Sequence, residues 1–363
     1  MIYLDHHSTT PVDARVAKAM WPYFMDNFGN PAAVHALGEE AKIAVEDARE
    51  KVAGLLGASP DQIYFTNSAS EANNIVLKSL DSFTITTNSE HSSIRRCLDN
   101  RIGNVIEINI LEDGNLNYQE LEENLKYHED IPKLVTIIAA NNEIGTIHDL
   151  YYIGELCEKY NAKFHTDATQ AIGKFPIDVN KMKLFALTMS GHKIYGPKGV
   201  GVLYVRDSSL LVPITDGGYQ NTFVSGTQNV PAIVGMGEAC EIINYEENIK
   251  IEQLRNYMLR KLLEEIPDIV VNGTMVNRLQ NNLNISIPGI PAEVLIKGLD
   301  DVIISGGSAC ESGNIEPSHI IQAINSPYPD CAIRISLGRS TTQQDVEQAA
   351  MRIAEAVASM RSE

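Results

Sequence analysis

The most informative segment of the chain is Ser190-Gly191-His192-Lys193-Ile194-Tyr195-Gly196-Pro197-Lys198-Gly199-Val200-Gly201. Apolar runs precede it at 184–189 and follow it at 202–205, and both are typical of buried strands. Its glycines let the backbone approach a ligand closely. Burial on a turn between two such strands can lower the pKa of a lysine, as a Schiff-base lysine requires. A surface loop with a solvated lysine is the alternative that this stretch alone leaves open.

The composition is that of a globular chain with more than one hydrophobic core. The 363 residues are 44% hydrophobic and 21% charged, which predicts one large and one smaller domain. The net charge of −18 opposes binding of nucleic acid by the whole surface, so we expect no direct nucleic-acid partner. The sequence contains no membrane-length apolar segment and no signal-peptide pattern at its start. We therefore expect a cytoplasmic protein without a membrane partner.

The cysteines and histidines do not have the spacing of a disulfide framework or a metal site. Five cysteines are scattered without a CxxC pair, which is typical of a reducing compartment and leaves at least one free thiol. His6 and His7 are adjacent in an extended segment, where neighbouring side chains point to opposite faces. We therefore predict that the chain binds no metal.

Strand and helix patterns alternate from about residue 60 to 205, which predicts a largely parallel α/β sheet with right-handed crossovers. A single long helix over about 230–264 is expected to lead into a second domain. Further strands are expected near 283–287, 302–304 and 332–339, before a helix over 344–360. We predict a large domain at 13–250 and a small domain at 1–12 and 251–363.

Polar residues follow four of the predicted strands, namely Ser70, His91, Asn142 and Asp167. The carboxyl ends of strands in an open α/β sheet are where ligands bind. The hydroxyl-rich turn 67–71 lies at a helix N-terminus and can bind an anion, although the same residues also form an ordinary capping box. Taken singly, His91 is more typical of a helix cap or a surface residue. The coincidence of the four positions is what predicts a site.

Two residues of the C-terminal part have the chemistry of a site. Cys310 lies in a Gly/Ser-rich segment at 305–313, whereas free cysteines are generally buried. A thiol placed there could reach a site and leave it again, while the alternative is a tolerated small residue. Arg334 lies on a predicted strand; such an arginine is commonly a salt-bridge partner, but its planar fork also fits a substrate carboxylate.

Together these residues resemble the cysteine desulfurases, the NifS/IscS-like branch of the class V aminotransferase-type pyridoxal 5′-phosphate (PLP) enzymes. The resemblance covers nearly the whole chain, and its most specific motif is Ser190–Lys193 followed by Gly196–Gly199. It implies the aspartate-aminotransferase-like fold (fold type I). In that fold a large domain with a mixed, mainly parallel seven-stranded sheet is joined to a smaller α+β domain that carries the cysteine loop. The supporting motifs are Asn141–Gly145, Asp167–Gln170, Gly307–Cys310 and Glu316–Ser318.

The resemblance also implies a role for each candidate site residue. Lys193 would hold PLP, Asp167 would pair with the pyridinium nitrogen, and His91 would stack on the ring. Gln170 and Asn142 would contact the phenolic oxygen of the cofactor and the substrate side. The other cofactor-binding residues, most of them at the phosphate, would be Ala69, Ser70, Ser190, His192 and, from the partner subunit of a homodimer, Thr227. The α-carboxylate of the substrate would be bound by Arg334.

The implied reaction removes sulfur from L-cysteine and leaves L-alanine. Lys193 would move the proton at the α-carbon, Cys310 as thiolate would take the sulfur as a persulfide, and His91 would assist proton transfer near the sulfur. A sulfur-acceptor protein would then receive the sulfur. Iron–sulfur cluster assembly, tRNA or cofactor thiolation and DNA phosphorothioation are the pathways that the sequence leaves open.

Two alternatives are a selenocysteine lyase or other β-eliminating PLP enzyme, and a sulfur-trafficking scaffold that has lost catalysis. Elimination needs no nucleophilic thiol, so Cys310 opposes the first, and the retained catalytic positions oppose the second. The chain departs from the family pattern at Val224, where an arginine is typical, at Ser70 in place of threonine, and at 6–8. The Val224 change bears on substrate access, rate and partner choice more than on PLP binding.

Overall fold

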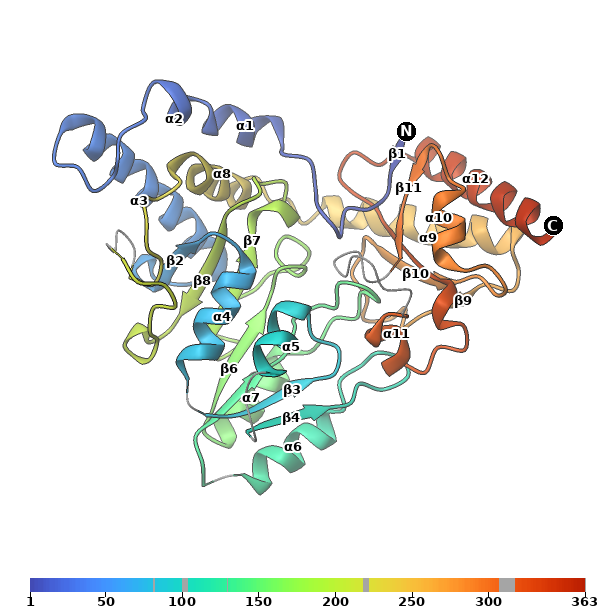
Figure 1. Cartoon of the computed structure of the whole chain (residues 1–363), viewed down its shortest axis with the longest axis horizontal. Coiled ribbons are helices and arrows are strands. Elements are labelled where there is room, and N and C mark those ends of the chain that lie inside the picture. The colour runs from blue at the N-terminus through green and yellow to red at the C-terminus, as the bar shows by residue number, and fades with distance from the viewer. Residues whose placement is uncertain (81, 100–103, 129, 218–221, 307–316, 363) are drawn as a thin grey trace.

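The computed structural model describes residues 1–80, 82–99, 104–128, 130–217, 222–306 and 317–362. Its main feature is a seven-stranded sheet in the order β2-β8-β7-β6-β5-β3-β4 (Figure 1). Strand β8 runs antiparallel to both of its neighbours, and the other adjacent pairs are parallel. The mixed, mainly parallel seven-stranded sheet expected from the sequence is confirmed. Its strands are β2 (Ile63–Thr66), β3 (Phe83–Thr87), β4 (Val105–Ile108), β5 (Lys133–Thr136), β6 (Ala162–Asp167), β7 (Ala186–Ser190) and β8 (Gly201–Val205).

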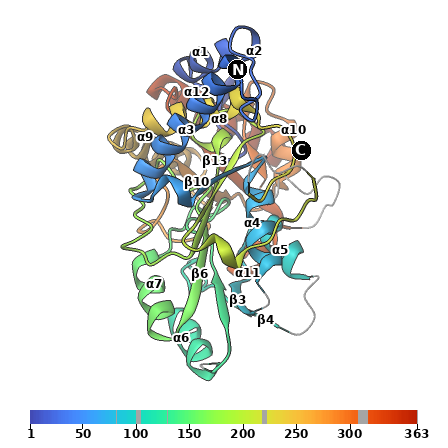
Figure 2. The ribbon, with the colours of Figure 1, turned by 90° about the vertical axis from the view of Figure 1, so that its left-hand side faces the viewer.

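Helices cover both faces of this sheet, as Figure 2 shows with the strands seen from the side. Along β8, Val202 and Tyr204 pack into one apolar cluster, whereas Leu203 and Val205 pack into another, because successive strand residues point to opposite faces. The second cluster contains α4 (Ala69–Ser79) and α5 (Ser92–Asp99). The first contains α1 (Ala14–Met20), α3 (Ala36–Leu56), α6 (Tyr118–Tyr127), α7 (Leu150–Lys159) and α8 (Val230–Glu241); the short α2 (Pro22–Met25) follows α1.

The single long helix predicted over 230–264 is wrong, because the structure has two helices there. Helix α8 ends before Ile242, and α9 begins after a short break and covers Glu247–Glu265. In the break, the side-chain oxygen of Asn244 accepts the Glu246 N–H at 3.0 Å, which offers the backbone a local alternative to the helical hydrogen bond. The β-branched Ile242 and Ile243 further reduce the helix propensity.

The C-terminal part is built on a four-stranded sheet in the order β12-β13-β10-β9, with antiparallel pairing throughout. The first strand of the chain, β1 (Ile2–Tyr3), lies in this part and pairs in parallel with β11 (Val302–Ile303) (Figure 1). The remaining elements are β9 (Val270–Val271), β10 (Asn282–Ser286), β12 (Ser305–Gly306), β13 (Ala332–Ser336), α10 (Ala292–Lys297), α11 (His319–Ala323) and α12 (Gln343–Ser362).

We propose that the two domains meet at about residue 250, as the sequence predicts. One apolar cluster runs from Val16 to Cys240 and adds Leu279. Another combines Ile2 and Leu4 with residues from 251 onward. The N-terminal segment thus supplies apolar side chains to the C-terminal core. Across the described ranges, the structure contains no helix of the length and apolar character that a bilayer crossing needs.

Candidate active site

A cavity of about 290 Å³ lies where β6 and β7 end, next to the first turns of α4 and α5. Side chains of β13 and α11 complete its wall from the C-terminal part. This is the carboxyl edge of the parallel strands, where the sequence predicts a site. The predicted site residues that line the cavity are Ala69, Ser70, His91, Asn142, Asp167, Gln170, Ser190, His192, Lys193 and Arg334.

Lys193 ends a short 3-10 turn, Gly191–Lys193 (η2), which directly follows β7. Its Nζ donates hydrogen bonds to the carbonyl oxygens of His7 and Ser8, the latter at 2.7 Å. Gly191 has no room for a side chain, since a Cβ there would lie 2.9 Å from the carbonyl oxygen of Pro197. The tight turn therefore carries the amine to the cavity wall, and the N-terminal segment holds it there.

Asp167 is a buried carboxylate at the end of β6, with both of its oxygens oriented by hydrogen bonds. Oδ1 accepts the Thr169 N–H at 2.9 Å, and Oδ2 accepts from the Asn73 side-chain amide at 2.9 Å. A carboxylate has about four lone-pair sites, so these bonds leave acceptor capacity for a cationic N–H on a ligand.

The start of α4 has the features of an anion site. Ser68 is the N-cap and accepts the Glu71 N–H at 3.1 Å. The first N–H groups of a helix have no partner within the helix, and Ala69 and Ser70, which line the cavity, lie in this first turn. The Glu71 carboxylate reaches back to the backbone N–H of Asn67 and not to that of the cap residue. Ser68 therefore caps the helix, but the reciprocal half of the predicted capping box is replaced by a contact to Asn67. The cap does not prevent the same turn from binding an anion.

His192 lies at the same cavity in a neutral form at pH 7. Burial, together with the charges of Lys193 and Lys198, lowers its pKa to about 4. Its Nδ1 lies 3.1 Å from the hydroxyl oxygen of Thr9. A neutral imidazole carries one N–H and one acceptor nitrogen, so it can still offer a hydrogen bond to an anion.

Arg334, on β13, closes the cavity from the C-terminal part and is 3% exposed. Its Nη1 donates to the carbonyl oxygen of Asn142 at 2.9 Å, and its Nη2 donates to Ser8 Oγ at 2.8 Å and Asp5 Oδ1 at 3.1 Å. The guanidinium is thus held in one orientation with an acidic partner beside it, which is the geometry suited to a planar carboxylate.

Several polar atoms of the cavity residues are buried and lack a hydrogen-bond partner within the described ranges. They include His7 Nδ1, Asn142 Oδ1, Thr169 Oγ1, Glu90 Oε2 and Arg334 Nε. Such atoms cost free energy unless something pairs with them, so their collection at one cavity fits a polar ligand. The amine of Lys193, the carboxylate of Asp167 and the start of α4 match the aldehyde, pyridinium and phosphate groups of PLP. In the part of the chain that the structure describes, the acidic, histidine and cysteine side chains form no metal-binding group of three or more.

Sequence reasoning missed Glu90 and His319, both of which line the cavity. Burial, partly opposed by hydrogen bonds from Ile138 and Thr87, raises the pKa of the Glu90 carboxyl to about 8. The Nε2 of His319, the first residue of α11, lies 3.3 Å from the Glu90 carbonyl oxygen. The available signals were the position of Glu90 next to His91 and that of His319 directly after the Glu316–Ser318 motif.

Some predicted positions lie elsewhere. Thr227 is exposed and does not line the cavity within a single chain. Cys310 lies outside the described residues. Val224 packs against the apolar cluster that contains Phe223, so it contributes to a core and not to the cavity wall.

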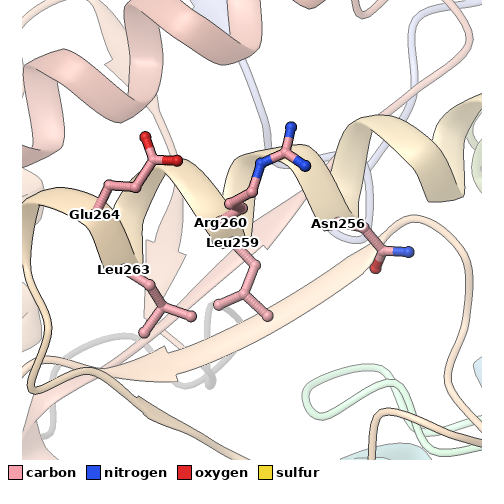
Figure 3. Close-up of a pocket in the computed structure, with 5 residues that line it drawn as sticks. All are labelled: Asn256, Leu259, Arg260, Leu263 and Glu264. Carbon is pink, nitrogen blue, oxygen red and sulfur yellow. The ribbon is translucent and has the colours of Figure 1, made fainter.

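A second hollow lies on the surface of α9 (Figure 3). It shares no residue with the cavity described above. All of its lining side chains come from one helix, so it is a surface feature and not a site assembled from several elements. They are Asn256, Leu259, Arg260, Leu263 and Glu264.

Comparison with known proteins agrees with this geometry. The aminotransferase class-V family model matches residues 2–349. Cysteine desulfurase IscS of Neisseria meningitidis is 39% identical in an alignment 379 residues long, which covers 99% of this chain and 93% of the relative. The structure of the NifS-like protein from Rickettsia africae is 34% identical, with a TM-score of 0.90 and 99% of both chains covered. The structure of SspA in complex with cysteine is 33% identical, with a TM-score of 0.82 and coverage of 94% of this chain and 100% of that one. The chain therefore belongs to the class-V aminotransferase family and, within it, to the cysteine desulfurases, whose members are PLP enzymes.

Proposed function

We propose that this chain binds PLP through Lys193, converts L-cysteine to L-alanine and takes the sulfur onto Cys310 as a persulfide. The observation that carries the proposal is the convergence, in one cavity, of the Lys193 amine, the Asp167 carboxylate and the buried Arg334 guanidinium. Asp167 is the last residue of β6, Lys193 lies in the turn that follows β7, and Arg334 lies on β13. A cavity with this combination suits an amino-acid substrate bound beside a phosphorylated pyridine cofactor.

PLP, when bound, supplies an electron sink that makes the α-proton of an amino acid acidic. Asp167 would hold the pyridine nitrogen in its protonated form, and Gln170 and Asn142 would contact the phenolic oxygen and the substrate. The phosphate would lie at the start of α4, where the first N–H groups and the helix dipole favour an anion. Its other contacts would be Ser70, Ser190 and the neutral His192.

The remaining chemistry is that of the chain's own side chains. Arg334 would bind the α-carboxylate of L-cysteine and thereby orient the α-carbon toward the Lys193 amine, which removes and returns the proton there. His91 would move protons near the substrate sulfur. The Cys310 thiolate would form a bond to that sulfur while the Cβ–S bond breaks and its electron pair stays with the carbon skeleton. The sulfur then leaves as a persulfide, and Cβ takes up a proton to become the methyl group of L-alanine.

The proposal extends to partners and compartment. A second copy of the chain would bring Thr227 to the phosphate, because this exposed residue does not reach the cavity of its own chain. A separate acceptor protein would receive the persulfide sulfur. Among the described cysteines, all four are buried free thiols, which is in keeping with a reducing compartment such as the cytoplasm.

The direct test measures L-alanine and sulfide released from L-cysteine under reducing conditions, for PLP-loaded wild type and for Cys310→Ala. Cys331→Ala is the matched control, because this cysteine is buried outside the cavity. We expect alanine from the wild type and the control, loss of alanine formation in Cys310→Ala, and a wild-type mass increase of one sulfur atom that Cys310→Ala lacks.

Undiminished sulfide release by Cys310→Ala would instead indicate a β-elimination that needs no nucleophilic thiol. Failure of purified wild type to bind PLP would favour a non-catalytic sulfur-trafficking protein. Either result would overturn the proposal.

A further inference from the structure

We infer that Asn73 is a positioning residue that connects the Asp167 carboxylate to the His91 imidazole and, through Ser93, sets the tautomer of His91. Neither Asn73 nor Ser93 lines the cavity, yet both contact a residue that does. The inference rests on the proposed function, which places Asp167 at the cofactor ring and His91 next to it.

Asn73 lies on α4, three residues after Ser70, and is fully buried. Its Nδ2 donates to Asp167 Oδ2 at 2.9 Å and to Ser93 Oγ at 2.9 Å, and its Oδ1 accepts from Thr188 Oγ1 at 2.6 Å. An amide has two N–H donors and a carbonyl oxygen that accepts, so these three contacts use both donors and one of the two lone pairs of the oxygen.

The orientation of this amide follows from its partners. An ionised Asp167 can only accept hydrogen bonds, so the NH₂ group of Asn73 must face it. The opposite orientation would place the Asn73 carbonyl oxygen against the Asp167 carboxylate. The observed orientation also requires the Thr188 hydroxyl to donate to Asn73 Oδ1, and Thr188 is a fully buried residue on β7 that faces α4.

Ser93 connects Asn73 to His91 by hydrogen bonds whose directions follow from that of the Asn73 amide. Ser93 Oγ accepts from Asn73, so its own proton is available for His91 Nδ1, which lies 2.8 Å away. The backbone N–H of Ser93 also points to this nitrogen, at 3.2 Å. Two donors that converge on Nδ1 leave it as the acceptor nitrogen, so the neutral ring carries its proton on Nε2.

This tautomer decides what His91 can do in the proposed reaction. With its proton on Nε2, neutral His91 begins as a hydrogen-bond donor toward the cavity ligands and not as an acceptor. A ring with its proton on Nδ1 would oppose the backbone N–H of Ser93. Helix α4 thus serves the site twice, because its first turn forms the anion site and Asn73, one turn later, orients Asp167 and His91 together.

The test compares Ser93→Ala, which removes the hydroxyl that lies between Asn73 and His91, with Asn73→Ala, which removes the amide that contacts both Asp167 and Ser93. Asn248→Ala is the matched control, because this buried amide donates to the carbonyl oxygens of Gly173 and Lys174 and does not line the cavity. ¹⁵N NMR of histidine-labelled full-length protein, with PLP and after its removal, reports the tautomer; His91→Gln assigns the signal.

We expect the Nε2–H tautomer for His91 in the wild type and in Asn248→Ala. In Ser93→Ala we expect a smaller but still dominant Nε2–H fraction, because the backbone N–H at position 93 still points to Nδ1. General acid–base groups contribute roughly 10²–10⁴ in rate, so loss of their orientation should lower kcat by on the order of tenfold to hundredfold, with a KM change below about twofold. Asn73→Ala should in addition bind PLP more weakly, because Asp167 loses a donor.

A wild-type Nδ1–H signal would overturn the inference, as would a Ser93→Ala variant with an unchanged spectrum and kcat. If Asn73→Ala does not fold, Thr188→Val and Ser93→Ala still decide the matter, since each removes one hydroxyl. The tautomer is read in the absence of PLP as well. Wild type that bound PLP but formed no alanine would therefore contradict the proposed function without deciding the tautomer.

Discussion

Glu90 shows how burial changes the chemistry of a side chain at the cavity wall. Its Oε1 accepts from Thr87 Oγ1 at 2.8 Å and from the Ile138 N–H at 2.9 Å. Burial is the largest cause of a pKa raised to about 8, and the nearby Asp167 charge adds to it. Glu90 is therefore mostly neutral at pH 7, so it is a weak partner for a cation at the cavity.

Replacement of Glu90 by glutamine should remove a pH dependence of stability. An unfolded chain ionises this group near its ordinary pKa of 4.5, so between about pH 4.5 and about pH 8 the folded state binds more protons than the unfolded state. The Glu90 contribution to the free energy of unfolding is complete below this range and falls as pH rises through it. We expect Glu90→Gln to gain stability relative to wild type over the same range, as measured by urea unfolding.

The control for this prediction is Glu50→Gln, since Glu50 is exposed on α3. Its stability should follow that of the wild type at every pH. If the free energy of unfolding changed with pH in the same way for wild type and Glu90→Gln, the Glu90 carboxyl would already be ionised at neutral pH.

At the scale of elements, the junction of β8 with α4 forms the anion end of the cavity. Gly201 begins β8, and a Cβ there would lie 2.4 Å from the carbonyl carbon of Ser68 and 2.7 Å from the Ala69 nitrogen. The contacted atoms are backbone, so they can move only if the whole helix start moves. The absence of a side chain at Gly201 therefore allows the first turn of α4 to rest on the sheet.

Gly201→Ala should displace this turn and weaken PLP binding. Overpacking of this kind typically lowers the free energy of unfolding by about 1–3 kcal/mol. We expect a loss in this range in urea unfolding, together with a higher dissociation constant for PLP in an absorbance titration.

The matched substitution is Gly54→Ala on α3, where a Cβ meets nothing within 4 Å. It should stabilise the protein by about 0.4–1 kcal/mol, because alanine reduces the entropy of the unfolded chain. PLP affinity equal to the wild type in Gly201→Ala would show that the helix start tolerates the shift.

At the scale of the whole molecule, Arg334 connects segments that are far apart in the sequence. From β13 it reaches the N-terminal segment at Asp5 and Ser8, and the turn after β5 at Asn142. The cavity is therefore formed only when the C-terminal part is packed against both. Loss of this side chain would affect the substrate site and the joint between the two parts at once.

Arg334→Ala should lower kcat/KM for L-cysteine, mainly through KM, because the α-carboxylate loses its charged donor. Charge-assisted hydrogen bonds contribute about 1.5–3 kcal/mol, which corresponds to a change on the order of tenfold to hundredfold in steady-state alanine formation. Arg334→Lys should recover part of the loss, since it restores the charge without the planar fork.

Arg352→Ala is the control, because this arginine forms exposed ion pairs on α12. Its kcat/KM should equal that of the wild type. An Arg334→Ala variant with wild-type KM would exclude Arg334 as the carboxylate ligand.

The linear sequence by itself determined the class of fold and the order of the site motifs along the chain. Strand and helix periodicity predicted a largely parallel α/β sheet, and the resemblance to the family implied that the sheet is mixed. Because the carboxyl ends of parallel strands meet at one edge, the strand pattern also predicted that Ser70, His91, Asn142 and Asp167 would lie at one site. The resemblance to the family added Lys193 to it. Local patterns suffice for such statements, since they depend on spacing within one or two elements.

Only the tertiary structure decided the features that depend on contacts between distant segments. These are the pairing of β1 with β11, the break between α8 and α9, the burial of Glu90 and the place of His319 at the cavity. The role inferred for Asn73 likewise depends on its hydrogen-bond partners on α5, β6 and β7. Burial and hydrogen-bond partners are properties of the packed chain, so no local pattern of residues specifies them.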